Sequence, residues 1–194
     1  KTTDMLGNAT DYTYDSEGNK LTETDAQGNT ASFTYDANGN LLDDGTTTYT
    51  YDYANRLASV ANGSNTSTYL YDGLGNRLAQ TIDGTTTQYT LDVAGGLPEV
   101  IRATTDGNTT DYLQVGGQLL AQQQSGTWQY MLPDHLGSVR QVVDADGNLI
   151  QSTSYTPFGE VMESEGAQQS AFGFTGEQRD ETGLLFLRAR YYAP

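Results

Sequence analysis

The chain has 194 residues, no cysteine, 25 acidic and 9 basic residues, and a formal net charge of −16. Without cysteine, disulfides and thiol chemistry are excluded, and the charge disfavours nucleic acid or an anionic membrane as a partner, because both are polyanions. The sequence also lacks a run of about 18 apolar residues, the length that a membrane-spanning helix needs.

A phrase of tyrosine, aspartate, two variable residues and glycine recurs along the first half of the chain. Clear copies begin at Tyr14, Tyr35 and Tyr71, and looser copies begin at Tyr51 and Leu91. The starts at 14, 35, 51, 71 and 91 are about twenty residues apart, and self-similarity at a fixed period is typical of a repeat architecture.

Each copy of the phrase predicts a β-hairpin. The residues before it, such as Thr48-Tyr49-Thr50-Tyr51, alternate a ring with a small hydroxyl residue, which is the pattern of a strand. Aspartate can accept a hydrogen bond from a backbone N–H two residues on, and glycine tolerates positive φ, so Asp-x-x-Gly predicts a turn. The predicted turn residues are Asp15, Gly18, Asp36, Gly39, Asp72, Gly75, Asp134, Gly137, Asp144 and Gly147, and the repeated aromatic residues are Tyr14, Tyr35, Tyr51 and Tyr71.

Tighter turns alternate with these wide ones. Asp-Gly pairs begin at Asp44, Asp83 and Asp106 between strand-like runs, and this dipeptide is a strong hairpin signal. The pattern predicts an all-β fold, an antiparallel meander of hairpins that forms a curved or spiralling strip. Near the end, residues 183–191 fit a helix or a buried strand equally well.

A second set of motifs follows the repeats and carries a family resemblance. In order these are Asp134-His135-Leu136-Gly137-Ser138-Val139-Arg140, Tyr155-Thr156-Pro157-Phe158-Gly159-Glu160, Phe174-Thr175-Gly176-Glu177-Gln178-Arg179-Asp180-Glu181-Thr182-Gly183-Leu184 and Arg188-Ala189-Arg190-Tyr191-Tyr192. Together with the tyrosine-aspartate phrase, they resemble the Rhs/YD-repeat family of bacterial polymorphic toxins, Tc-toxin C subunits and teneurins. We therefore expect a YD-repeat array over residues 1–127 and an Rhs-associated core-like region over 128–194 that continues the same sheet.

The resemblance implies a hollow shell of spiralling repeats, closed at one end by the core region, around a toxin. Bacterial members free that toxin by an aspartate-dependent self-cleavage just past the core. The family's Tyr-Tyr-Asp-Pro reads Tyr191-Tyr192-Ala193-Pro194 here, and the cleavage segment would follow Pro194. We therefore expect this chain to be non-enzymatic and to need no cofactor.

Two chemical alternatives compete with the turn interpretation. Asp134, His135 and Ser138 invite comparison with a catalytic triad, but a triad needs converging groups and an oxyanion hole, and the motif already fits a turn. Asp144, Asp146 and Asn148 alternate oxygen ligands as in a calcium loop, but the glycine and the bidentate glutamate of an EF-hand are not in place. We expect neither a catalytic nor a metal site.

The last sixteen residues hold three of the nine basic residues of the chain. Arg179, Asp180, Arg188 and Arg190 lie there, beside the place where relatives cleave themselves. We expect these arginines to pair with acidic turns and pin the tail onto the sheet, where Arg–carboxylate pairs fix register.

Two functions of different class remain. The first is a structural module of a secreted or cell-surface Rhs/YD-repeat shell, with further repeats and an enclosed toxin polypeptide as its partners. The second is an extracellular fibre or adhesin subunit, a homopolymer built through open strand edges. Carbohydrate binding through exposed tyrosines and Trp128 has no specific residue support.

Overall fold

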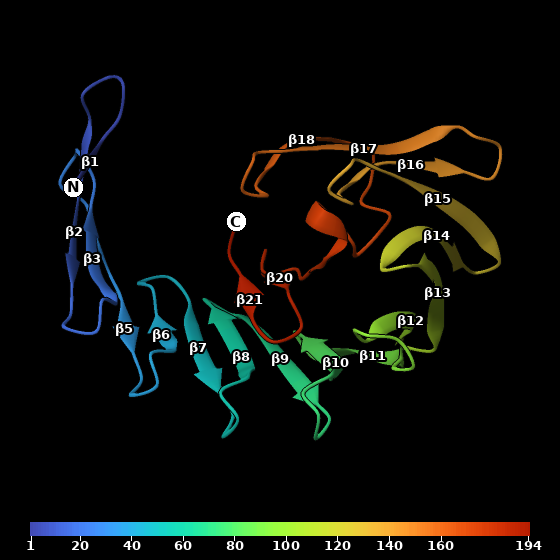
Figure 1. Cartoon of the computed structure of the whole chain (residues 1–194), viewed down its shortest axis with the longest axis horizontal. Helices are drawn as coiled ribbons and strands as arrows, with labels where there is room; N and C mark the ends of the chain where they lie inside the picture. Colours follow the sequence, from blue (N-terminus) through green and yellow to red (C-terminus); the bar gives the residue numbers. More distant parts are fainter. The chain divides into compact units, whose positions relative to one another are not determined.

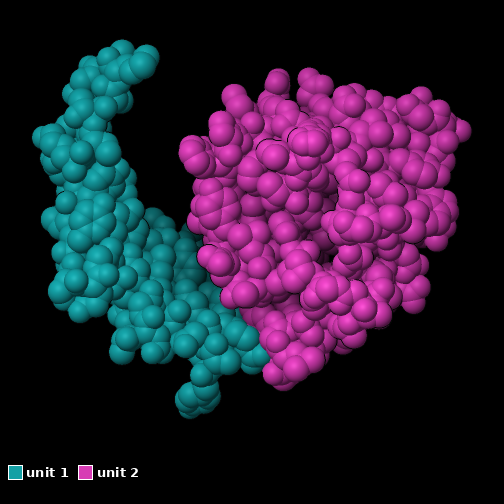
Figure 2. Space-filling model, in the orientation of Figure 1, with its two compact units in different colours: residues 1–68 teal, residues 69–194 magenta.

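The computed structural model describes residues 1–194 as two compact units, residues 1–68 and 69–194 (Figures 1 and 2). Strands and turns make up both, and the helical content is a single 3₁₀ turn, η1 (Phe174–Gly176). The prediction of an all-β antiparallel fold is confirmed. A helix that is long and apolar enough to cross a membrane does not occur.

The first unit is a run of short antiparallel strands. A four-stranded sheet in chain order is followed by a ladder in which each strand pairs with the next. The strands are β1 (Thr2–Thr3), β2 (Ala9–Tyr14), β3 (Lys20–Thr24), β4 (Thr30–Ser32), β5 (Thr34–Tyr35), β6 (Leu41–Asp43), β7 (Thr48–Tyr51), β8 (Leu57–Asn62) and β9 (Asn65–Tyr71). The boundary between the units falls within β9.

The second unit continues the meander with longer strands. Each again pairs with its neighbour in the chain, and the strands follow an arc (Figure 1). They are β10 (Arg77–Ile82), β11 (Thr85–Asp92), β12 (Glu99–Thr105), β13 (Asn108–Val115), β14 (Gln118–Gln124), β15 (Thr127–Pro133), β16 (Val139–Asp144), β17 (Leu149–Tyr155) and β18 (Val161–Glu165). The sequence-based boundary at 127/128 lies inside this unit, in β15, which pairs with both β14 and β16.

The C-terminal tail, residues 166–194, turns back inside the arc (Figure 1). It carries η1 and a small antiparallel sheet of β19 (Gln178–Arg179), β20 (Leu185–Phe186) and β21 (Tyr191–Tyr192). Of the two alternatives for residues 183–191, the structure has the strand, since Leu185 and Phe186 are buried in β20.

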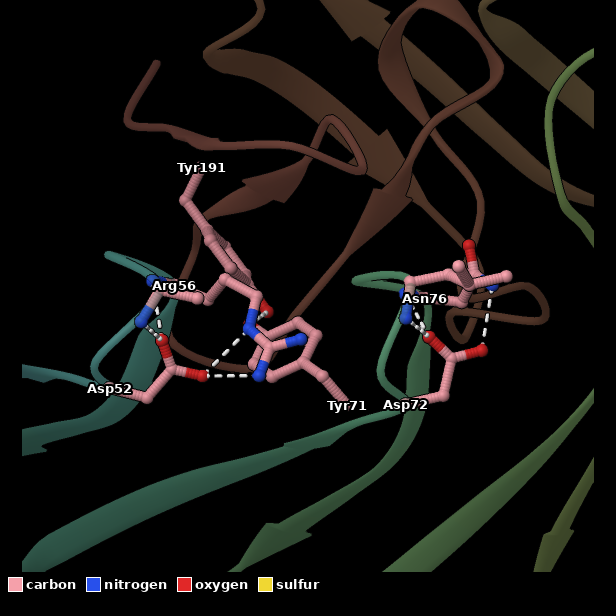
Figure 3. Close-up of polar contacts among 8 residues, drawn as sticks. Asp52, Arg56, Tyr71, Asp72, Asn76 and Tyr191 are labelled. Carbon is pink, nitrogen blue, oxygen red and sulfur yellow. Dashed lines mark hydrogen bonds and ion pairs between the residues drawn. The ribbon is translucent and has the colours of Figure 1, made fainter.

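The wide turns close through their aspartates. In the turn after β9, Asp72 Oδ1 accepts from the backbone N–H of Leu74 and Asn76, and Oδ2 accepts from Asn76 Nδ2 (Figure 3). Gly75 has φ +93 and donates its N–H to the Asp72 carbonyl. The same three carboxylate bonds occur in the turns that begin at Asp4, Asp15, Asp25, Asp36 and Asp144.

Two copies of the phrase depart from this geometry. At Asp52 the glycine position is Asn55, which adopts φ 59, and Arg56 Nε replaces the asparagine amide as donor to Asp52 Oδ2 (Figure 3). At Asp92 the chain forms an irregular loop after β11, and only the N–H of Ala94 bonds the Asp92 carboxylate.

Candidate functional site

The tail is held against the strands of the second unit by an apolar cluster. Phe172 packs with Leu119, Met131, Val139 and Val142, which come from β14, β15 and β16. Its ring meets Tyr112 of β13 edge-on, with centroids 5.1 Å apart. The five residues of the cluster are buried and Tyr112 is partly buried, so burial of apolar surface helps to hold the tail on this side of the sheet.

A glutamine network fixes the start of the tail. The Gln169 carbonyl and side chain lie between Gln122 of β14 and Gln129 of β15, whose amides bond each other. The backbone N–H of Gln169 donates to Gln151 Oε1 of β17. These bonds set the position of the tail along three strands.

The centre of the site is Arg77, the first residue of β10, whose side chain is 1% exposed. Its Nη1 donates to both carboxylate oxygens of Asp180, at 2.9 and 2.8 Å, and its Nη2 donates to Gln178 Oε1 at 3.0 Å. Nη1 also lies 3.2 Å from the Tyr191 hydroxyl. One guanidinium therefore contacts three separate residues of the tail.

Four aromatic rings surround the same guanidinium. Its Cζ lies 4.1 Å from the Phe186 centroid, and 5.3 to 5.8 Å from those of Tyr69, Tyr89 and Tyr191. Tyr71 and Tyr191 meet through their hydroxyls at 3.1 Å (Figure 3). Such rings attract a cation through their negative faces, and more strongly when water is excluded.

Burial and the opposite charge of the partner have opposing effects on the pKa values of Arg77 and Asp180. Burial lowers the pKa of Arg77, but the Asp180 carboxylate and the neighbouring tyrosines outweigh it and hold that pKa above its usual value. Burial raises the pKa of Asp180 against the opposing charge of Arg77. Burial also raises the pKa of Tyr89 to about 12. The ion pair is therefore shielded from solvent, and leaving either partner there without the other would cost stability.

The Asp180 turn differs from the other wide turns in where its carboxylate points. Its backbone closes in the same way, with the N–H of Gly183 donating to the Asp180 carbonyl. Position 184 is leucine, which lacks the side-chain amide of asparagine, and the backbone N–H of Leu184 bonds Thr182 Oγ1 at 3.4 Å. The carboxylate is thus free to reach Arg77.

The predicted tail cluster divides into different contacts. Asp180 pairs with Arg77, and Arg188 pairs with Glu177, which is itself in the tail. Arg179 and Arg190 form no ion pair, which differs from the expectation that all the arginines would pair with acidic turns. Arg190 is exposed, and Arg179 is partly buried beside a cavity described below.

Sequence reasoning missed Arg77, the residue that makes most of these contacts. It stands at the end of the copy of the phrase that begins at Tyr71, in Gly75-Asn76-Arg77-Leu78, and the phrase assigns it no contact. The available signal is its place in the strand, because Arg77 and Ala79 face the buried side of β10 while Leu78 is exposed. A charged residue on the buried face of a strand needs a partner of opposite charge or a hydrogen-bond acceptor.

The predicted turn residues lie in turns. Asp134, His135 and Ser138 do not form a catalytic triad. Asp134 Oδ1 accepts from the N–H of Leu136 and Ser138, while Ser138 Oγ accepts from Thr175 of the tail. His135 is exposed. The Asp144 carboxylate is bonded to its own turn, and no group of three or more His, Asp or Glu side chains is placed to hold a metal ion.

The repeat tyrosines have different surroundings. Tyr14 is exposed and stacks at a tilt near Tyr12, with centroids 6.5 Å apart. Tyr35, Tyr51 and Tyr71 are partly buried. Burial raises the pKa of Tyr51.

Comparison with known proteins agrees with this architecture. The Teneurin YD-shell family matches residues 102–194, and the RHS Repeat family matches residues 1–30. The chain belongs to the Rhs/YD-repeat family. The YD-shell match includes the whole tail and the strands from β13 to β18.

Relatives of this Rhs/YD-repeat chain include a bacterial nuclease and a bacterial toxin subunit. The tRNA3(Ser)-specific nuclease WapA of Bacillus spizizenii is 31% identical over 160 residues, which are 78% of this chain and 7% of that protein. Toxin subunit YenC1 of Yersinia entomophaga is 28% identical over 155 residues, which are 68% of this chain and 16% of that subunit. The chain therefore spans a small part of the relatives that it matches.

The fold is also found in a solved structure. The crystal structure of TcdB2-TccC3-Cdc42 matches 96% of this chain and 12% of its own chain, with a TM-score of 0.59 and 16% sequence identity. At this identity the likeness concerns the fold.

Proposed function

We propose that this chain is a structural segment of an Rhs/YD-repeat shell that encloses a toxin polypeptide. The observation that carries the proposal is the tail docked inside the arc of strands through the Arg77–Asp180 pair. A tail fixed in this way closes over one side of the sheet and holds the curvature of strands β10 to β17. The match to toxin subunit YenC1 supports a toxin as the enclosed polypeptide.

Images of the full-length native protein test this proposal. We expect hollow, closed particles by electron microscopy, with the enclosed polypeptide protected from added protease. Substitution of Asp180→Asn in that protein should increase cleavage of the enclosed polypeptide, because the tail loses its charged anchor. Regular filaments of the native protein would contradict the shell and favour the fibre, which the comparisons do not support.

We also propose that the segment itself is not an enzyme, although its relative WapA is named as a tRNA nuclease. The shared residues are 7% of WapA, and a net charge of −16 opposes the approach of a polyanion. Incubation of this chain with tRNA should leave the RNA intact. Cleavage that persists after purification to homogeneity would overturn this part of the proposal.

The parent protein should be secreted or exposed at the cell surface, as the toxin relatives suggest. Antibody against this segment should detect it in culture medium or on intact cells. Signal found solely in the soluble lysate would contradict this location.

A further inference from the structure

A cavity separate from the Arg77 site lies between the tail and strands β17 and β18. Its volume is about 170 Å³, and its polar lining includes Gln151, Thr153, Ser164, Ser170 and Arg179. Since a water molecule takes up roughly 30 Å³ of liquid, the cavity has room for a small polar group. It is distinct from the Arg77 site, and one of its lining residues, Phe172, belongs to the apolar cluster.

Arg179 supplies the one charge of this lining. Its backbone N–H bonds the Ala171 carbonyl, which holds the residue beside the cavity, but its guanidinium makes no ion pair or hydrogen bond with the protein. No aspartate or glutamate lines the cavity, although the chain carries 25 of them. The planar guanidinium has five N–H donors in a fork that matches a carboxylate.

The acidic residues of β18 lie on the face of the strand opposite to the cavity. Ser164 pairs across the sheet with Thr153, and their hydroxyls lie 3.5 Å apart on the cavity side. Neighbouring residues in a strand face opposite sides, so Glu163 and Glu165 point to the other face. On β16, Arg140 lies 3.8 Å from Asp134 and over the ring of Tyr155.

Further donors line the cavity. Ser170 Oγ accepts from the backbone N–H of Phe172, which leaves its own hydroxyl hydrogen available. Thr153 Oγ1 accepts from Gln151 Nε2, and its hydroxyl hydrogen is likewise available to Ser164 or to a bound group. Arg179 with two or three hydroxyls can therefore satisfy both oxygens of a carboxylate.

We propose that this cavity, the Arg179 cavity, binds a carboxylate group. The carboxylate comes either from an acidic side chain of another polypeptide segment or from a free small carboxylic acid. The site does not depend on the shell proposed above, because it lies within one compact unit of this chain.

Titration with acetate tests the proposal on the whole chain. The Arg179 Nε–H resonance should shift and saturate as acetate is added at constant ionic strength. Arg179→Gln should weaken acetate binding at least about tenfold, which corresponds to about 1.4 kcal/mol. Arg190→Gln is the matched control, since Arg190 is also an unpaired tail arginine but is exposed, and it should leave binding unchanged.

A second variant keeps the proposal testable if Arg179→Gln fails to fold. Ser164 lies on the exposed edge strand β18. Ser164→Ala should therefore weaken acetate binding a few-fold and leave thermal unfolding unchanged. Two peptides that differ by Asp→Asn then separate the sources. If the Asp peptide competes with acetate and the Asn peptide does not, the site takes an acidic side chain; if acetate alone binds, it takes a free acid.

Other outcomes overturn the proposal. A shift of the Arg179 resonance that does not saturate, or equal loss of binding in Arg190→Gln, means that the cavity has no carboxylate site. Binding of inorganic phosphate in place of acetate, with no response to either peptide, also contradicts it.

Discussion

Arg77 and Asp180 lie 103 residues apart in the sequence, and their side chains form an ion pair in which each is 1% exposed. The pair joins β10, the strand that follows the phrase beginning at Tyr71, to the C-terminal tail. Because both charges have left water, the pair need not add stability over a well-packed apolar pair, but it allows only one alignment of the tail.

The first prediction concerns removal of one partner of this pair. Arg77→Met leaves the Asp180 carboxylate buried without its cation, so the free energy of unfolding should fall by about 3–5 kcal/mol. The double variant Arg77→Met/Asp180→Leu should recover most of this loss. Urea unfolding measures both changes, and protease cleavage within residues 166–194 reports release of the tail.

Arg102→Met is the matched control for this experiment. Arg102 pairs with Asp111 across β12 and β13, but the two side chains are 51% and 39% exposed. Solvent screens such a pair, so its loss should change stability little. Equal effects of the Arg77 and Arg102 substitutions would show that the buried pair does not anchor the tail.

The strands and turns could be predicted from sequence because their chemistry is local. Asp83 and Gly84, for example, adopt φ 47 and φ 89 in a tight hairpin turn, and both residue types tolerate positive φ. The Asp-x-x-Gly-Asn turns likewise contain their own donors and acceptors within five residues. The period of the phrase then places successive strands side by side.

The tail site could not be predicted in the same way, because its contacts are long-range. The sequence places Asp180 in a charged cluster, but nothing near it in sequence identifies Arg77 as its partner. The proximity of Arg179 to other charges predicts an ion pair, whereas in the structure Arg179 lies beside a cavity whose lining has no carboxylate. Pairing of surface charges depends on tertiary placement, which spacing alone does not give.

The second prediction compares two phenylalanines. Phe172 is 8% exposed and packs in the apolar cluster, whereas Phe158 is 73% exposed at a wide turn. Phe172→Ala should lower the free energy of unfolding by about 3–5 kcal/mol, and Phe158→Ala should change it by no more than about 0.5 kcal/mol. The contact of Tyr192 with Phe158 uses the backbone carbonyl and survives the substitution. Similar urea midpoints for the two variants would refute the role given to Phe172.

The third prediction compares two glycines with the same backbone conformation. Gly166, where the chain leaves β18 for the tail, has φ +81, and Gly147 between β16 and β17 has φ +84. A side chain in this region costs about 1–2 kcal/mol at either site. A Cβ on Gly166 would in addition overlap the backbone carbonyl oxygen of Ile150, while one on Gly147 meets nothing within 4 Å.

Gly166→Ala should therefore destabilise the chain more than Gly147→Ala and expose the tail to protease. Urea unfolding and limited proteolysis measure the two effects. If the two alanine variants unfold at the same urea concentration, the tail does not depend on the close approach at Ile150.

The fourth prediction concerns acid. Hydrogen bonds from Asn76 lower the pKa of Asp72 below its ordinary value of 3.8, and bonds from Asn148 do the same for Asp144. A carboxyl whose pKa is lower in the folded chain contributes stability above its unfolded pKa, and this contribution is lost as the pH falls through the folded pKa. The free energy of unfolding should therefore drop below about pH 4, as the turn carboxylates take up protons together.

Two substitutions in the repeat turns separate this effect from general charge repulsion. Asp72→Asn cannot ionise, so it should be less stable than the parent chain at neutral pH, and the difference should shrink in acid. Asp146→Asn removes the same charge from a turn residue whose carboxylate accepts no hydrogen bond, and its unfolding should follow the parent at every pH. Parallel pH profiles for Asp72→Asn and the parent would mean that the turn carboxylates do not carry the acid sensitivity of the repeats.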